Sequence, residues 1–266
     1  MTTVRLSVVI ITKNEAQRLP TCLASVAFAD ELIVVDSGST DGTVDLARHA
    51  GAKVIETKDW PGFGPQKQRG LDAATGQWIL CIDADEWLDA ELTDAIKQLL
   101  RSPDNIKAPF VYEIHRLSAF CGQWMRHGSW SPDIGVRLFR RGSAHFSEDL
   151  VHERLIFDSQ PGRLQGQLLH NSIISIHDGV DKMNRYTTGR AKDQRRQGKQ
   201  GGLGKAIGHG LWSFFRSYFF KCGFMDGKLG FVLATMDAQN SYYRYLKLWL
   251  DERTAPHKLP VIGANK

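Results

Sequence analysis

Three clusters of polar residues in the N-terminal third have the residue types and spacing that chemistry requires. They are TKNEAQ, with Thr12, Asn14 and Glu15; DSGSTDGT (Asp36–Thr43); and IDADEWL, with Asp83 and Asp85. Two neighbouring carboxylates repel each other unless a cation lies between them or one is protonated. A hard divalent cation resolves this repulsion, and Mg²⁺ typically combines one or two carboxylates with substrate phosphates. The pair Asp83 and Asp85 therefore indicates a metal–phosphate site.

Each cluster also has a purely structural interpretation. Asn14 can cap a helix whose dipole Glu15 then favours. DSGSTDGT has the composition of a turn followed by a helix cap, although two acids with two glycines exceed what capping requires. The acids that follow the fourth apolar run could simply begin a helix. TKNEAQ contains no glycine, which argues against a dinucleotide-binding GxGxxG turn and a Rossmann dehydrogenase.

Short β-branched runs alternate with helical patterns around these clusters. Strands are predicted over 6–12, 31–37, 52–57 and 77–83, and helices near 16–27, 43–50 and 66–74. Such alternation predicts a parallel sheet covered on both faces, with ligands at the carboxyl ends of the strands. Each polar cluster follows one of these strands. We therefore expect the clusters to meet at one edge of the sheet.

The pattern changes beyond residue 105. VYEIHRL, IGVRLFRR and GRLQGQLLH predict an antiparallel or mixed extension of the sheet, and a helix is expected from Asp178 to about Gln197. Glycines among basic residues over 198–210 indicate a hinge or loop, with a further apolar helix over 229–250. We expect a domain over 1–200 and an amphipathic helical extension over 201–266.

Composition narrows the class of protein. The 266 residues are 42% hydrophobic and 24% charged, which excludes a disordered or collagen-like chain. The four cysteines are far apart and form no CxxC pair, which argues against a zinc ribbon or a disulfide framework and suits a reducing cytosol. The N-terminal residues lack the features of a signal peptide. No window holds eighteen uncharged apolar residues, so a spanning helix is disfavoured.

The charge is unevenly distributed. Residues 1–100 carry nine basic and fifteen acidic side chains, a net of −6, whereas residues 181–228 carry eleven and three, a net of +8. The aromatic run Leu211–Phe220 lies within this basic segment, and aromatics mixed with cations are typical of an in-plane interfacial helix. We expect an anionic membrane surface or a phosphorylated sugar as partner; a solvated helix face, internal packing and a dimer interface are the alternatives. No nucleic-acid motif accompanies the charge, so no nucleic-acid partner is expected.

Several segments together resemble a known family. VVIITKNE, LIVVDSGSTDGT, QKQRGLDAATGQWILCIDADEWL and DLVHERL resemble family 2 glycosyltransferases of the GT-A fold. More closely, they resemble the lipopolysaccharide-core β-1,4-glucosyltransferases of Gram-negative bacteria. The resemblance covers roughly residues 4–170 and continues through Gly223–Phe231. It implies an α/β, GT-A-type, mostly parallel sheet flanked by helices, with a C-terminal helical membrane-associating extension.

The resemblance also implies site residues. Those that would bind the nucleotide-sugar are Thr12, Asn14, Glu15, Asp36, Ser37, Lys67, Arg69 and Asp83. Among them, Asp36 would meet the uracil, Lys67 or Arg69 would approach the base and phosphates, and Asp83 would hold the ribose. Asp85 would bind a Mg²⁺ or Mn²⁺ ion that bridges the diphosphate, and His170 matches a late position that supplies another metal ligand. The alternative for His170 is an ordinary core or surface histidine.

The general base is expected in HFSEDLVHERL. An inverting sugar transfer needs a carboxylate that takes the proton of the acceptor hydroxyl. Glu148, Asp149 and Glu153 are available. We favour Glu153, because His152 and Glu153 have the VHE form of the nearer relatives. The acidic pair Glu148–Asp149 is the alternative.

These observations predict a metal-dependent inverting glycosyltransferase. It would move a hexose, expected to be glucose, from a UDP-sugar to a sugar hydroxyl of the lipopolysaccharide inner core. It would lie peripherally on the cytoplasmic face of the inner membrane, where the acceptor is lipid-anchored. Transfer to polyprenyl phosphate or another surface glycan is the alternative reaction. A non-catalytic, membrane-associated sugar-nucleotide-binding protein is the alternative of another class, against which the intact DxD argues.

Overall fold

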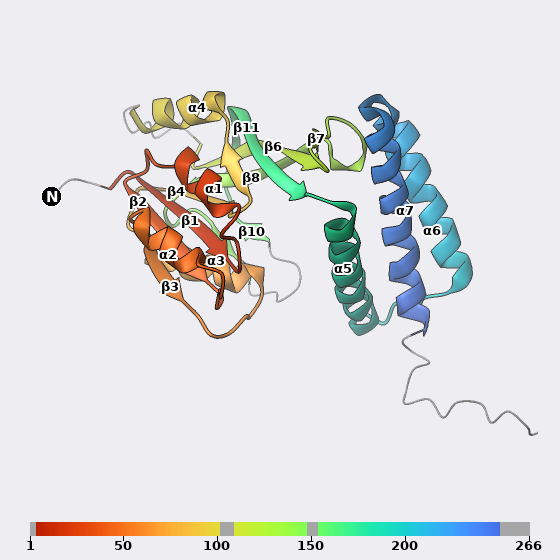
Figure 1. Ribbon diagram of the computed structural model, residues 1–266. Coiled ribbons are helices and arrows are strands. Elements are labelled where there is room, and N and C mark those ends of the chain that lie inside the picture. Colours follow the sequence, from red (N-terminus) through yellow and green to blue (C-terminus); the bar gives the residue numbers. More distant parts are fainter. Residues whose placement is uncertain (1–3, 102–108, 148–153, 251–266) are drawn as a thin grey trace, which may run out of the picture. The chain divides into compact units, whose positions relative to one another are not determined.

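The computed structural model describes residues 4–101, 109–147 and 154–250, which form two compact units (Figure 1). The first, here called the sheet unit, is Met1–Trp124 with Pro132–Ser172. The second, the helical unit, is Met125–Ser131 with Ile173–Lys266. The boundary expected at residue 200 differs from this division, because the helix before it packs with the helices after it.

The sheet unit follows the predicted alternation of strands and helices. Its first half contains β1 (Leu6–Thr12), α1 (Leu19–Ser25), β2 (Glu31–Asp36), α2 (Thr43–His49), β3 (Lys53–Glu56), α3 (Phe63–Ala73) and β4 (Trp78–Asp83). Its second half contains β5 (Glu86–Leu88), α4 (Ala90–Arg101), β6 (Val111–Phe120), β7 (Gln123–Trp124), β8 (Asp133–Arg140), β9 (His145–Phe146), β10 (Leu155–Ile156) and β11 (Gly162–Ile173). The expected α/β class is confirmed.

The main sheet has the strand order β3-β2-β1-β4-β8-β6-β11-β5, and β7 pairs with β6. Strands β3, β2, β1 and β4 run parallel, as the first hundred residues predict. Strand β8 then joins antiparallel to both β4 and β6, and β11 joins antiparallel to β5. The extension expected beyond residue 105 is therefore present and makes the whole sheet mixed.

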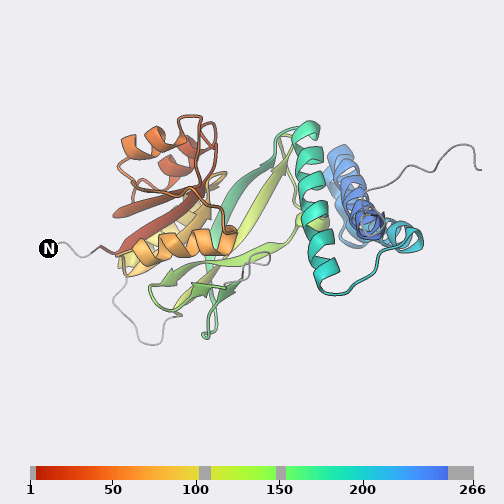
Figure 2. The same ribbon diagram turned by 90° about the horizontal axis from the view of Figure 1, so that it is seen from below.

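Helices cover both faces of the parallel half, with α1 and α2 on one side and α3 on the other (Figure 2). Alternate residues of β1 divide between the two cores: Val8 and Ile10 pack in a cluster with α1, and Val9 packs in a cluster with α3. This period of two is what a strand buried on both faces requires. The α3 side packs closely, since a Cβ at Gly70 would lie 2.3 Å from Cγ1 of Val9.

The helical unit contains α5 (Ile176–Arg196), α6 (Leu203–Phe215) and α7 (Gly227–Leu250), with the short elements η1 (Gly128–Trp130), η2 (Arg216–Phe220) and η3 (Gly223–Asp226). Helix α7 packs against both α5 and α6. The loop predicted over 198–210 is confirmed for residues 198–202 and wrong for the rest, because α6 already begins at Leu203. One of its glycines allows close helix packing: a Cβ at Gly210 would lie 3.3 Å from the carbonyl oxygen of Ala238 in α7. None of the helices within the described residues is both long and apolar enough to cross a membrane.

The segment Met125–Ser131 precedes β8 in the chain but packs with the helices. The backbone amide and Nδ1 of His127 each lie 2.8 Å from a carboxylate oxygen of Asp226. The hydroxyl of Ser129 donates to Asp237 of α7, which also accepts from Ser217 at 2.8 Å. Two buried or half-buried acids of the helical unit thus hold this segment.

Candidate active site

Strand register brings the ends of three parallel strands together. Thr12 at the end of β1 pairs with Asp36 at the end of β2, and Ile11 pairs with Asp83 at the end of β4. The three clusters singled out in the sequence therefore share the carboxyl edge of the sheet, where doubly wound folds bind their ligands.

Asp36 is buried and organises the loop that follows β2. One carboxylate oxygen accepts hydrogen bonds from the amides of Gly38 and Ser39, at 2.9 and 2.8 Å. The other accepts from the hydroxyls of Thr12 and Ser39, at 2.8 and 2.5 Å. A carboxylate offers about four acceptor positions, so these bonds occupy its full capacity. The contact between Asp36 and uracil stays a prediction, and it requires that a base replace one of these donors.

The loops after β1 and β2 bind each other. Asn14 has a left-handed backbone (φ 57°), which asparagine tolerates, and its side-chain oxygen accepts from the amide of Thr40 at 2.8 Å. The amide of Glu15 donates to the hydroxyl of Thr43 at 2.8 Å. Ser37 accepts from the side-chain amide of Gln66, a buried residue that the sequence analysis did not identify. The hydrogen bonds of Asn14 and Glu15 join the loops that follow β1 and β2, and we call the two joined loops the braced rim.

Asp83 lies between two cations. Its carboxylate is 3.0 Å from Nζ of Lys67, which is 3% exposed, and 3.8 Å from Nη1 of Arg137 in β8. Burial alone would raise the pKa of Asp83, but Lys67 and Arg137 outweigh it and hold that pKa well below its usual range. Asp83 is therefore ionised at neutral pH.

Only one of the two cations predicted from QKQRG reaches this carboxylate. Lys67 projects from α3 to Asp83, whereas Arg69 forms a two-pronged pair with Asp59, at 3.0 and 2.6 Å. Residues three and four apart share a face of a helix, but two apart do not, which explains why these side chains diverge. Lys67 is thus the residue that this geometry offers to a phosphate.

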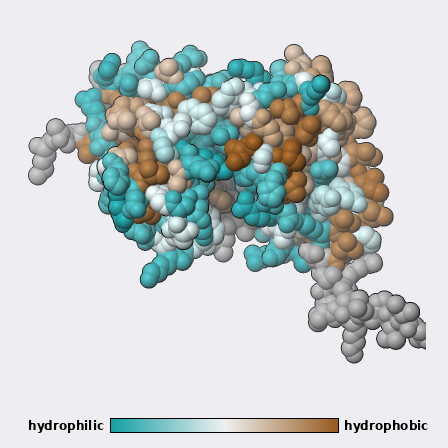
Figure 3. Space-filling view, viewed as in Figure 1, coloured by the Kyte–Doolittle hydropathy of each residue, from teal (hydrophilic) through white to brown (hydrophobic). Residues whose placement is uncertain are grey.

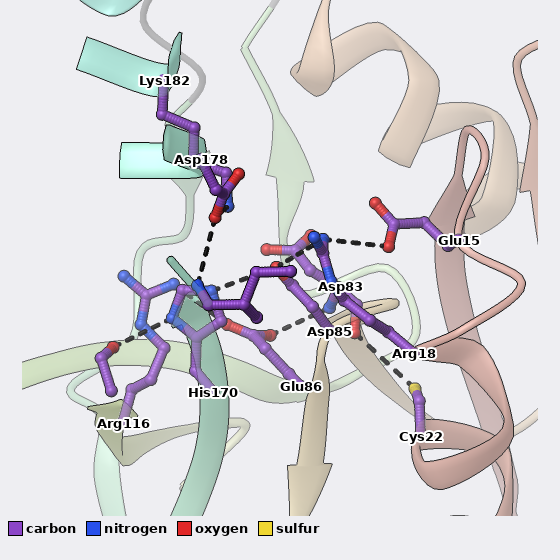
Figure 4. A network of polar contacts seen from close by, with 12 residues as sticks. Glu15, Arg18, Cys22, Asp83, Asp85, Glu86, Arg116, His170, Asp178 and Lys182 are labelled. Carbon is purple, nitrogen blue, oxygen red and sulfur yellow. Dashed lines mark hydrogen bonds and ion pairs between the residues drawn. The ribbon is translucent and has the colours of Figure 1, made fainter. Parts of the chain in front are cut away.

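Asp85 and His170 lie next to each other at the same edge of the sheet as Asp83 (Figure 4). Strand β11 pairs with β5 so that His170 lies opposite Glu86, directly after Asp85 in the chain. Nε2 of His170 is 3.4 Å from Oδ2 of Asp85, and its Nδ1 is 2.9 Å from the hydroxyl of Ser118. Nη1 of Arg18 lies 3.8 Å from the same Asp85 oxygen and 3.2 Å from Glu15.

These residues fit a divalent cation. A carboxylate and an imidazole converge on one point, and Ser118 fixes the far nitrogen of the ring, as an outer partner of a metal ligand does. No group of three or more His, Cys, Asp or Glu side chains suited to a metal occurs in the part of the chain that the structure describes. Two protein ligands would leave coordination positions for phosphate oxygens, with which Mg²⁺ sites commonly complete their coordination.

Further charged side chains are buried next to Asp85 and His170. Glu86 is fully buried and accepts from Arg116 at 3.0 Å, from Arg137 at 3.1 Å and from the amide of Asp83 at 2.9 Å. Burial would lower the pKa of Arg137, but Glu86 and Asp83 raise it above its ordinary value. The sequence analysis missed these arginines as site residues. Their signal was a cation within each of two otherwise β-forming runs, VYEIHRL and IGVRLFRR.

The candidate bases cannot be added to this geometry. Glu148, Asp149 and Glu153 lie outside the described residues, and so does His152. The choice of Glu153 over the acidic pair stays a prediction.

Comparison with known proteins shows that this chain is similar to glycosyltransferases. The family model described as glycosyl transferase family 2 matches residues 7–143. An uncharacterized glycosyltransferase of Rickettsia typhi is 34% identical over 254 residues, which span 92% of this chain and 86% of that protein. The lipopolysaccharide core biosynthesis glycosyltransferase LpsC of Rhizobium meliloti is 31% identical over 253 residues, covering 90% and 93%.

Among solved structures, the Staphylococcus aureus protein TarS (residues 1–349) in complex with UDP-GlcNAc is similar with a TM-score of 0.46 and 15% identity, covering 96% of this chain and 93% of that one. The family match includes every residue of the edge described above except His170, and the full-length relatives extend it to the helical unit. With the strand-end carboxylates and their cations in place, the chain belongs to glycosyl transferase family 2.

Proposed function

We propose that this glycosyltransferase moves a hexose, glucose in the expected case, from a UDP-sugar to a sugar hydroxyl of the lipopolysaccharide inner core, with inversion. The observation that carries the proposal is the convergence of Asp85 and His170 beside the Asp83–Lys67 ion pair. The similarity to LpsC, which is named for lipopolysaccharide core biosynthesis, supports the class of acceptor.

The described residues account for the donor side of the reaction. Asp85 and His170 would hold Mg²⁺ or Mn²⁺, which supplies positive charge to the diphosphate when bound. Lys67 and Arg18 add fixed positive charge at the same edge. The negative charge of the diphosphate grows as the sugar leaves, and preorganised cations stabilise that charge more in the transition state than in the ground state.

The nucleoside would lie along the braced rim of the β1 and β2 loops. Asp83, kept ionised by Lys67 and Arg137, accepts hydrogen bonds and suits the ribose hydroxyls. Hydrogen bonds between its two loops hold the rim in the geometry described, so we expect binding to cost little ordering entropy.

The acceptor side rests on the predicted base, Glu153 or its alternative Asp149. The acceptor is lipid-anchored, so the proposed location is the cytoplasmic face of the inner membrane. Direct transfer from the nucleotide-sugar leaves UDP as the second product.

A nucleotide-sugar panel tests the proposal. The protein is incubated with UDP-glucose, UDP-galactose, UDP-GlcNAc and a GDP-hexose, with and without inner-core acceptor, in buffers containing Mg²⁺, Mn²⁺ or a chelator. UDP release that depends on both metal and acceptor, and that is fastest with UDP-glucose, is the expected result. Acceptor-independent rates in every buffer would contradict the proposed acceptor, and full activity in chelator would contradict the metal.

A further inference from the structure

Large apolar side chains of helix α6 and of the short π-helical element η2 face solvent instead of the interior of the helical unit. The buried residues of this stretch are small, namely Ala206, Gly210 and Ser217, and His209 and Phe214 also contact α7 through Tyr245 and Phe231. The outer face has large apolar side chains at four-residue spacing, each 47–57% exposed: Leu203, Ile207, Leu211, Phe215 and Phe219. We call these five residues the apolar ridge. A surface helix normally buries its apolar stripe and exposes polar residues.

Further exposed aromatics widen the ridge into a surface. Trp212 and Phe220 are 57% and 72% exposed, and the centroids of their rings lie 5.7 Å apart. Phe224, Met225 and Phe231 from η3 and α7 are each about half exposed or more. Figure 3 shows the resulting hydrophobic side chains along the right edge of the molecule. Isolated exposed apolar residues are ordinary, but a contiguous patch of this kind marks an interaction site.

Within residues 203–231, which form this surface, the exposed charges have one sign. Lys205, Arg216 and Lys228 are exposed. The single acid of this segment, Asp226, is buried and bonded to His127. We call the three cations the positive rim of the ridge.

We propose that the apolar ridge and its aromatic neighbours insert in-plane into an anionic lipid surface, with Lys205, Arg216 and Lys228 at the headgroups. Helices with a broad apolar face, aromatic residues and flanking cations bind membranes in this way. A second copy of the chain fits the surface less well, because a symmetric interface would bring equal positive rims together. The proposal does not depend on the donor or acceptor assigned above.

The sequence predicted that the basic segment 181–228 and its aromatic run Leu211–Phe220 contact an anionic surface together, and the structure divides these features between two helices. Arg195 and Arg196 lie at the end of α5, whereas the aromatic run lies in α6 and η2. Arg195 is half-buried and donates to the carbonyl oxygen of Leu248, at 3.4 Å. The α5 charges can attract the protein to an anionic surface, but the exposed apolar side chains that enter it belong to α6 and η2.

Flotation of the full-length protein with vesicles tests the ridge. Vesicles of phosphatidylcholine alone are compared with vesicles of phosphatidylcholine and phosphatidylglycerol. The ridge variant combines Leu211→Gln, Phe215→Gln and Phe219→Gln, and the matched control combines Leu46→Gln and Ile156→Gln, exposed apolar residues of the sheet unit. We expect the ridge variant to lose about tenfold or more of its binding to anionic vesicles, and the control to bind like the unmodified protein.

Two further measurements keep the test decisive if the ridge variant folds poorly. Brominated lipids should quench tryptophan fluorescence in the unmodified protein, and this quenching should fall in Trp212→Phe. The variant with Lys205→Gln, Arg216→Gln and Lys228→Gln, which keeps the ridge intact, should bind anionic vesicles less and respond less to salt.

The proposal is overturned by unchanged flotation of a folded ridge variant, by equal binding to neutral and anionic vesicles, or by quenching that does not involve Trp212. It is also overturned if the unmodified protein fails to float but sediments as a dimer that the ridge substitutions dissociate. That last outcome would make the ridge an interface between two copies.

Discussion

The sheet unit and the helical unit depart from ordinary burial in opposite directions. At the strand ends, the sheet unit buries charge: Lys67 and Glu86 are 3% and 0% exposed. In the helical unit, α6 exposes Leu, Ile and Phe side chains over small buried residues. Buried charges and exposed apolar patches are the informative exceptions to the usual distribution. We relate the buried charges to the proposed nucleotide-sugar and the exposed apolar side chains to the proposed lipid surface.

The buried charges do not owe their position to stability. Taking ions out of water costs several kcal/mol each, and a buried network is often no more stable than apolar side chains of the same volume. The network of Asp83, Lys67, Arg137 and Glu86 instead fixes cations at the strand ends. Substitutions in the sheet unit should therefore alter chemistry and leave vesicle binding unchanged, whereas ridge substitutions should do the reverse.

Asp85→Asn should have the largest effect. It retains the shape of the side chain but removes the charge that would hold a divalent cation. Metal-bound charge is worth several kcal/mol in the transition state, so transfer should fall by about 10³-fold or more. Transfer rates and Mn²⁺ binding by calorimetry measure the loss, with the exposed Asp45→Asn as control. Unaltered Mn²⁺ affinity would remove Asp85 from the metal site.

Glu153→Gln extends the comparison to the acceptor side. The amide cannot take a proton, and general-base assistance is typically worth about 10²–10⁴-fold in rate. We expect turnover to fall by that factor while the affinity for UDP, measured by calorimetry, stays the same. Asp149→Asn is the matched variant. If Asp149→Asn stops turnover and Glu153→Gln does not, the base belongs to the acidic pair.

Asp36→Ala should have a smaller effect, of mixed origin. The change removes an acceptor from four donors, three in the loop after β2 and one on Thr12 at the end of β1; two of the four are backbone amides. Losing such a partner costs about 1–3 kcal/mol, so UDP should bind roughly 5- to 150-fold more weakly. Thermal unfolding without ligand separates the two origins. A lower melting temperature with unchanged UDP affinity would limit Asp36 to holding the loop.

The smallest expected effect concerns Asp237 of the helical unit and the way in which the unfolding free energy depends on pH. Burial raises its pKa above the ordinary value, despite the hydrogen bonds from Ser129 and Ser217. An acid with a raised folded pKa stabilises fully below its unfolded pKa, about 3.9, and this contribution is lost as pH rises through the folded value. The unfolding free energy of the unmodified protein should therefore fall over this pH interval, and that of Asp237→Asn should fall less.

Urea denaturation at a series of pH values measures this difference. The gap between Asp237→Asn and the unmodified protein should change across the titration of Asp237 and then become constant. A gap that is the same at every pH would show that the carboxyl group titrates alike in the folded and unfolded chains.

The sequence predicted the parallel half of the sheet and its polar edge because both depend on local patterns. Apolar runs define β1 to β4, and the residues after them must lie at one edge whatever the rest of the chain does. Pairing between distant strands has no such pattern. Glu86 meets Arg116 and Arg137 only because β5, β6 and β8 enter one sheet in a particular register.

In the helical unit the local pattern gave a partly incorrect prediction, because packing between distant segments decides the structure there. Local composition over 198–210 predicted a loop, since glycine disfavours helix by about 1 kcal/mol per residue relative to alanine. Packing reversed that preference, because glycine is what permits α6 to approach α7 closely. The sequence alone could not establish that the large residues of α6 are exposed, because the same apolar pattern is compatible with internal packing.

The segment Met125–Ser131 has a consequence for how this protein can be divided. It leaves the sheet unit between β7 and β8, bonds to Asp226 and Asp237 more than ninety residues later, and returns. A chain cut after Ser172 would retain His127 and Ser129 but lose both acids that bind them. Exchanging the C-terminal helices between relatives would likewise have to carry this inserted segment along. The helical unit is therefore not a separable C-terminal module, because one of its segments comes from within the sequence of the sheet unit.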